Sequence, residues 1–355
     1  MRWRGRVAVV VVVVVVVVAG GLFAAGCKRP SRSSAEPWLE LTVAVDRTSF
    51  AYQQGDRVVL HGAAGERRLR VGTGCLLGGS TLHIIGPSRV LALKQLVKGD
   101  PLDQHPERSS APPCVLDFEA RTARPAAELL PGLELEAGAE VVWGRSGNLY
   151  VQRRGEPRAR VWKDGRLSPL ELELSEHCDL VETGDAVMSA CFDDVDGRTV
   201  LALRQLSLAG SPPRPIVTLH SDLPEQRLDV EARLSRDGRF VAVFGHIGAT
   251  GPEPADESFL QVRDTATGEL RFEQHEKGRT PSFIDVDFAP DGEALVALMQ
   301  VNDSEGGSYR GEIWLQRYDL AGKATRLATA APVQSYRVRW LADGQLMCER
   351  GPCPK

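Results

Sequence analysis

APDGEALVAL, residues 289–298, joins an Asp-Gly pair to a run of apolar residues, and similar phrases return along the chain. They are GRSGNLYVQ (144–152), DVDGRTVLAL (194–203), SRDGRFVAVF (235–244) and LADGQLMCE (341–349). Asp-Gly and Ser-Gly supply a tight turn, because glycine adopts positive φ without steric cost, and the apolar run after the turn has strand character. The turn glycines recur at intervals of 41 to 54 residues, which is typical of a repeat architecture. They are Gly147, Gly197, Gly238, Gly292 and Gly344.

A second phrase alternates with the first. It occurs as VWKDGRLSPL (161–170), LQVRDTATGELRF (260–272) and WLQRYDLAGKATRL (314–327). In each case a strand ends in aspartate, and glycine with a polar residue opens the next strand. Each period therefore holds four short strands and two tight turns, while helical periodicity is scarce. This pattern predicts an all-β fold, a β-propeller of six to seven four-stranded blades, over residues 38–355.

The two phrases resemble the blades of the periplasmic TolB-type and WD-repeat-like propellers. The resemblance is closest over residues 288–329 and fades before residue 140, and the WD dipeptide itself is absent. The resemblance implies a propeller domain in the cell envelope.

The remaining blades are predicted from the strand pattern. The first contains LTVAV, SFAYQQ, DRVVLHG and RRLRV, and the second contains LHIIG, RVLALKQL, PCVLDFEA and AELL. Blades three to six are predicted at about 140–174, 186–220, 228–275 and 283–329. The last hairpin, YRVRWLADGQLMCERG, leaves two arrangements open: a six-bladed ring with this tail packed on it, or a seven-bladed ring with an incomplete last blade. Trp143, Trp162, Trp314 and Trp340 fall inside predicted strands, where packing between blades explains them more simply than sugar stacking.

Long connections between the second and third strands are predicted to emerge on one face, opposite the tight glycine turns. They span residues 97–113, 246–258 and 301–312. Long loops on a rigid scaffold commonly carry binding residues, although loops also tolerate insertions at little cost. The candidate binding face consists of Asp103, His105, Arg108, His246, Asp256, Glu257, Asp303, Tyr309 and Arg310.

The N-terminus carries an export signal. Three arginines precede twenty uncharged residues, Val7 to Gly26, and Cys27 follows two alanines and a glycine. The segment resembles the lipobox of bacterial lipoproteins, in which this cysteine is acylated and becomes the first residue, although Ala24 stands where leucine is commonest. A retained signal anchor and simple secretion remain alternatives, since about 20 apolar residues can also span a bilayer. The predicted division is a signal peptide at 1–26, a lipid-attached tether at 27–37 and the propeller at 38–355. Because Lys28 is not the aspartate that retains some lipoproteins at the inner membrane, the sequence favours the outer membrane, facing the periplasm.

Charge and cysteine content narrow the class of partner. Removal of residues 1–26 takes three arginines and no acid, which leaves 40 basic against 47 acidic residues. This balance argues against a nucleic-acid surface. Six cysteines remain besides Cys27, and an oxidising compartment permits disulfides. Six cysteines allow 15 pairings. Proximity in sequence favours Cys178 with Cys191 and Cys348 with Cys353, and free buried thiols are the alternative.

Sequence motifs for catalysis, metal binding or a cofactor are lacking. There is no HExxH, P-loop or GxSxG motif, and the carboxylates of FDDVDG (192–197) miss the ligand positions of a calcium loop. We therefore expect no catalytic residue, no metal and no cofactor. The favoured hypothesis is a non-catalytic binding or scaffold module for an envelope protein or a cell-wall component. The alternative is a propeller-type enzyme, a polysaccharide lyase or hydrolase or a quinone-dependent dehydrogenase, with acids and bases gathered at the propeller axis.

Overall fold

The computed structural model divides the chain into two units, Met1–Pro37 and Trp38–Lys355. All described elements belong to the second unit. The described residues are 39–44, 47–71, 75, 80–94, 113–133, 135, 139–144, 146–152, 158–170, 178–183, 186–195, 198–207, 214–219, 227–247, 257–277, 282–301, 312–330, 337–348 and 351–353. None of the helices formed by these residues is long and apolar enough to cross a membrane.

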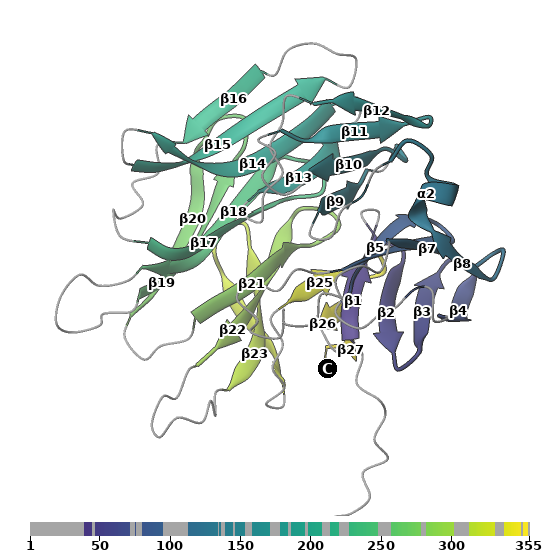
Figure 1. The fold of residues 1–355 in the computed structure, drawn as a ribbon. Helices are drawn as coiled ribbons and strands as arrows, with labels where there is room; N and C mark the ends of the chain where they lie inside the picture. Colours follow the sequence, from purple (N-terminus) through teal and green to yellow (C-terminus); the bar gives the residue numbers. More distant parts are fainter. Residues whose placement is uncertain are drawn as a thin grey trace, which may run out of the picture. The chain divides into compact units, whose positions relative to one another are not determined.

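The second unit is a seven-bladed β-propeller (Figure 1). Each blade is an antiparallel sheet whose strands follow one another in chain order. The prediction of an all-β propeller is confirmed, and the arrangement with an incomplete last blade is the one the chain adopts. Blades 1 to 6 have four strands, and blade 7 has three in the described part of the chain.

The strands of blades 1 to 3 are short, four to seven residues each. Blade 1 contains β1 (Leu39–Val43), β2 (Phe50–Gln54), β3 (Arg57–Gly62) and β4 (Gly65–Arg70). Blade 2 contains β5 (Ser80–Gly86), β6 (Arg89–Lys94), β7 (Cys114–Asp117) and β8 (Thr122–Pro125), followed by the helix α2 (Ala126–Leu129). Blade 3 contains β9 (Glu140–Trp143), β10 (Leu149–Gln152), β11 (Arg160–Lys163) and β12 (Arg166–Pro169).

The strands of blades 4 to 6 have five to ten residues, and those of blade 7 have two or three. Blade 4 contains β13 (Asp179–Thr183), β14 (Ala186–Val195), β15 (Arg198–Ser207) and β16 (Arg214–Leu219). Blade 5 contains β17 (Arg227–Leu234), β18 (Phe240–Ile247), β19 (Glu257–Asp264) and β20 (Leu270–Lys277). Blade 6 contains β21 (Ser282–Phe288), β22 (Ala294–Gln300), β23 (Ile313–Asp319) and β24 (Ala324–Ala330). Blade 7 contains β25 (Val338–Trp340), β26 (Leu346–Cys348) and β27 (Gly351–Pro352).

Three sequence predictions about blade boundaries were wrong. The AELL stretch is not the outer strand of blade 2, because the preceding residues form β8 and residues 126–129 form α2. Blade 4 begins at Asp179 rather than at residue 186. Gly197 does not lie in a turn between first and second strands, since residues 196–197 connect the second strand of blade 4 to the third.

The core is divided among the interfaces between blades. The described residues form six hydrophobic clusters, and each joins two successive blades, from blades 1 and 2 to blades 6 and 7. The four predicted tryptophans take part in this packing: Trp314 is buried in the cluster of blades 5 and 6, and the other three pack against neighbouring clusters. None of these six clusters spans blades 7 and 1. There, the Ala342 amide donates to the Arg47 carbonyl oxygen at 2.9 Å.

One turn recurs between the first and second strands. In blades 1, 3, 5, 6 and 7 a residue with positive φ donates its amide to the carbonyl three residues earlier, at 2.9 to 3.0 Å. Glycine fills this position in four blades, because the left-handed region disfavours a Cβ atom. In blade 1 the residue is Arg47, with φ of 61°.

Candidate functional site

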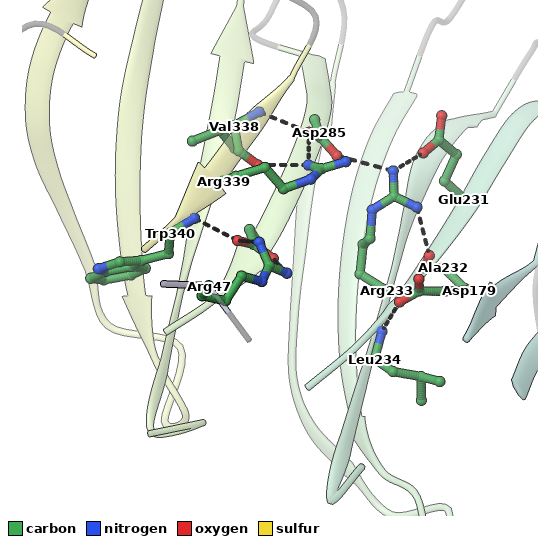
Figure 2. A network of polar contacts seen from close by, with 11 residues as sticks. Arg47, Asp179, Glu231, Ala232, Arg233, Leu234, Asp285, Val338, Arg339 and Trp340 are labelled. Atoms are coloured by element: carbon green, nitrogen blue, oxygen red, sulfur yellow. Dashed lines mark hydrogen bonds and ion pairs between the residues drawn. The ribbon is translucent and has the colours of Figure 1, made fainter. Parts of the chain in front are cut away.

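Charged residues cluster on the first strands of blades 4 to 7, together with Arg47 from the turn after β1 of blade 1 (Figure 2). Asp179 is the first residue of β13, whereas the charged residues of β17, β21 and β25 lie near the ends of their strands. First strands of neighbouring blades contact one another, as β13 contacts β17, β17 contacts β21, and β21 contacts β25, so they are the inner strands of the propeller. We call this set the inner-strand network. Its members are Arg47, Asp179, Glu231, Arg233, Asp285, Asp287 and Arg339.

Asp285 joins three blades. Its carboxylate is buried and accepts hydrogen bonds from Arg339 Nη1 at 2.5 Å and from Arg233 Nη2 at 3.3 Å. It also accepts the backbone amide of Val338 at 2.8 Å. Because Arg233 comes from blade 5 and Val338 from blade 7, this one carboxylate connects both neighbours of blade 6.

Asp287 holds the turn that contains Arg47. The Arg47 guanidinium forms two parallel hydrogen bonds with the carboxylate, at 2.7 and 2.8 Å, and the Trp340 amide donates a third at 2.6 Å. Burial raises the pKa of Asp287, while the charges of Arg47 and Arg339 oppose that rise. A two-pronged pairing of this kind fixes geometry as well as charge, so blade 1 is positioned against blade 6 across the interposed blade 7.

The same arrangement recurs between blades 4 and 5. Asp179 accepts the amide of Leu234 at 2.6 Å, and Leu234, like Trp340, is the last residue of its inner strand. Burial alone would lower the pKa of Arg233, but the carboxylates of Asp285, Asp179 and Glu231 outweigh burial and raise it. Arg233 therefore remains charged within the network.

These contacts give the network a structural role. Acids at the propeller axis would favour an enzyme if they were available to a substrate. In the described residues, the oxygens of Asp285 and Asp287 are engaged by arginines and by backbone amides of the next blade. The two carboxylates therefore connect neighbouring blades to one another.

Another buried carboxylate, Glu182 of β13, connects blade 4 to blade 3. It accepts the Ser146 amide and hydroxyl, each at 2.8 Å, the Asn148 amide group at 3.4 Å, and the Tyr150 hydroxyl. Burial, and then Glu182, raise the pKa of Tyr150, so this phenol stays protonated as a donor. Gly144 makes room for the carboxylate, since a Cβ atom there would lie 2.1 Å from Glu182 Oε1.

His83 lies on β5, the inner strand of blade 2. Its side chain is partly accessible, and Thr81 Oγ1 lies 3.2 Å from its Nε2. Burial, with a smaller effect from Arg337 of the last blade, lowers its pKa to about 4.

We expect His83 to make folding sensitive to acid. Between pH 6.5 and about 4 the unfolded chain takes up a proton at this position and the folded chain does not, so stability falls as the pH falls. From pH 7.5 to pH 4.5 the loss from this residue is on the order of 2 kcal/mol. Urea unfolding of wild type and His83→Gln at both pH values should show a smaller loss in the variant, by about that amount. Equal losses would contradict the prediction.

The predicted binding face lies almost entirely outside the described residues. Only the backbones of His246 and Glu257 are described, at the facing ends of β18 and β19. The other members, and Cys27, lie outside the described part. The bounds of β18 and β19, of β22 and β23, and of β6 and β7 place the three long connections between second and third strands.

Sequence reasoning missed the inner-strand network. A signal was present: EARL (231–234), DVDF (285–288) and RVRW (337–340) each alternate charged and apolar residues before the recurring turn. Arg47 had no such signal, because the blade 1 turn lacks the glycine that marks the others.

Three disulfides join Cys75 to Cys114, Cys178 to Cys191 and Cys348 to Cys353. The last two are the pairs that proximity in sequence favoured. No group of three or more histidine, cysteine, aspartate or glutamate side chains within the described part is arranged to hold a metal ion.

Comparison with known proteins identifies the fold. No protein-family model matches the chain, and no curated protein matches its sequence. Among solved structures, Hsv2 of Kluyveromyces lactis is similar with 11% identity and a TM-score of 0.53, over 88% of this chain and 89% of that one. Hsv2 of Kluyvelomyces marxianus has 9% identity and a TM-score of 0.52, over 89% and 90%. TolB of Acinetobacter baumannii has 11% identity and a TM-score of 0.41, over 89% and 78%, which is too low to support an inference. At these identities the likeness shows the propeller fold alone.

Proposed function

We propose that the chain is a lipoprotein of the cell envelope whose propeller is a non-catalytic binding or scaffold module. Its partner would be another envelope protein or a cell-wall component, bound through the long connections between second and third strands. The observation that carries this proposal is the inner-strand network, in which the buried acids Asp285 and Asp287 bind partly buried arginines and backbone amides and so connect blades. Because these charged groups already bind within the ring, the ring can act as a fixed support from which the loops bind a partner.

Two further observations support the compartment. The apolar segment that ends at Cys27 supplies an export signal of the lipoprotein kind. The three disulfides fit an oxidising compartment outside the cytoplasm. Acylation of Cys27 would anchor the propeller to the outer membrane, on its periplasmic side.

The first test is the intact mass of the membrane-extracted protein beside a Cys27→Ala variant. We expect the wild-type mass to lack residues 1–26 and to carry acyl groups, and we expect the variant to lose them. A wild-type mass that retains residues 1–26 would contradict lipidation and would indicate a retained anchor.

The same preparation tests the binding face. Reversing the charges of Asp103, Arg108, Asp303 and Arg310 should abolish crosslinking to the envelope partner. Matched reversals of Glu269 and Lys323, exposed residues in the tight turns of the opposite face, should leave crosslinking unchanged. Turnover of an envelope polysaccharide by the purified chain, lost with the loop reversals, would replace the binding proposal with the enzyme alternative.

A further inference from the structure

The second and third strands of blade 4 are longer than the strands beside them. β14 and β15 pair along their whole length, from Ala186 opposite Ser207 to Val195 opposite Arg198. β13 pairs only with residues 186–190 of β14, and β16 pairs only with residues 201–205 of β15. Among the described residues, positions 192–195 and 198–200 therefore pair only with each other. We call these two segments the hairpin arm.

The hairpin arm extends blade 4 on the same face as the three long connections, because it too belongs to a connection between second and third strands. Two strands alone are marginally stable in water, and independent stability needs a third strand or apolar packing. One apolar contact is described at the base of the arm, where Phe192 packs against the hydrophobic cluster of blades 4 and 5. The order of the arm therefore depends on how firmly its base is held.

A disulfide holds this base. Cys191 is the residue of β14 immediately before the arm, and it is bonded to Cys178, which directly precedes β13. The two cysteines continue the register of β13 and β14 by one residue beyond the pair of Asp179 and Ala190, with their Cα atoms 4.3 Å apart. Within the described part of the chain, the disulfide is the last link between β13 and β14 before the arm begins.

This disulfide is also the most accessible of the three. Cys178 is half-buried, whereas the other five bonded cysteines are buried. Cys348 and Cys353, for example, lie within the hydrophobic cluster of blades 6 and 7. Thiol–disulfide exchange requires that a thiolate reach one of the two sulfur atoms, so exposed disulfides are the labile ones. A reductant can therefore approach Cys178 without disturbing the core, which it cannot do at the other two disulfides.

We propose that the disulfide between Cys178 and Cys191 is a reversible redox clip that controls the order of the hairpin arm. The reductant is a protein dithiol of the same compartment. One thiolate of the dithiol attacks the sulfur of Cys178, and the sulfur of Cys191 leaves as a thiolate and takes up a proton. The second thiol of the dithiol then displaces Cys178 from the mixed disulfide, so the chain gains two thiols and the dithiol becomes a disulfide.

Reduction removes the link between β13 and β14 at the base of the arm. The arm is then held by its own strand pairing and by the packing of Phe192, and it opens more often. The clip acts on the face where a partner is proposed to bind. The proposal does not depend on that binding, because the order of the arm is measured on the chain alone.

Graded reduction tests the lability of the clip. The purified, full-length exported protein is equilibrated with increasing concentrations of dithiothreitol, free thiols are alkylated, and each cysteine pair is followed by peptide mass spectrometry. We expect the pair of Cys178 and Cys191 to open at a several-fold lower dithiothreitol concentration than the other two disulfides. Earlier opening of either of the other disulfides, or opening of all three together, would overturn the proposal.

Hydrogen exchange tests the coupling between the clip and the arm, because it reports local opening. At the dithiothreitol concentration that opens only this disulfide, the amides of residues 192–195 and 198–200 should exchange several-fold faster than in the oxidised chain. The amides of residues 187–190 are the matched control, since they lie on the same strand but between β13 and β15, and their exchange should not change.

A double variant, Cys178→Ala with Cys191→Ala, should show the fast exchange of the arm without any reductant. If this variant does not fold, the comparison of oxidised and reduced wild type still decides. Equal exchange of the arm in the oxidised and reduced chains, or faster exchange throughout blade 4, would show that the disulfide does not control the arm.

Discussion

Glu182→Ala is expected to lower the free energy of unfolding by about 3 to 5 kcal/mol. The carboxylate is 4% exposed and accepts from a backbone amide, two side-chain hydroxyls and an amide group of blade 3. Alanine would remove the acceptor of the buried Asn148 and Tyr150 side chains, and each buried unsatisfied group costs about 1 to 3 kcal/mol. Denaturant unfolding with the disulfides intact measures the loss.

Two controls separate the hydrogen bonds from packing. Glu182→Gln keeps the size and one acceptor oxygen, so its loss should be clearly smaller. Gly144→Ala should destabilise the wild type, because its Cβ atom would lie 2.1 Å from Glu182 Oε1, but it should add little in the Glu182→Ala background. Additive losses from Gly144→Ala and Glu182→Ala would contradict this account.

Asp285→Ala is the second change with a large expected effect, again about 3 to 5 kcal/mol. It would leave Arg233 and Arg339 without this carboxylate and would remove the acceptor of the Val338 amide. We therefore expect faster hydrogen exchange at the Val338 amide together with the loss of global stability.

The matched control for Asp285 lies in the same blade. Asp291→Ala removes a carboxylate from an exposed turn, where it accepts only the Glu293 amide among the contacts described, at 3.0 Å. This change should cost no more than about 1 kcal/mol and should leave Val338 protected. Equal effects of Asp285→Ala and Asp291→Ala would show that the inner-strand network does not hold the blades together.

The sequence predicted the blades wherever glycine marks the turn. Gly238, Gly292 and Gly344 each occupy a left-handed position that a side chain disfavours, so the phrase and the structure coincide. In blade 4 the first two strands are joined by only residues 184–185, and the Asp-Gly pair lies one connection later, which displaced the predicted boundary. AELL was misread because Ala, Glu and Leu favour a helix after Pro125 as readily as their apolar character suggests a strand.

The site was harder to predict, for a different physical reason. Asp285 and Arg339 are 54 residues apart, and Arg47 and Asp287 are 240 apart, so their pairing depends on the closure of the ring. A linear pattern can show alternating charges on an inner strand, but the partner of each charge is set by which blades become neighbours. The long loops, in contrast, were placed from strand order alone, and their role in binding stays a prediction.

Ring closure through Arg47 has a consequence for the order of assembly. Each hydrophobic cluster needs only two blades that follow one another in the chain, so successive blades can pack in chain order. Arg47 and Ala342 instead lie near opposite ends of the propeller sequence, so their hydrogen bond can form only after blade 7 has formed. Because the entropic cost of closing a loop grows only slowly with its length, a few polar contacts suffice to lock a ring whose blades are already stacked. We therefore expect the seam between blades 7 and 1 to form last during folding and to open first in native-state fluctuations.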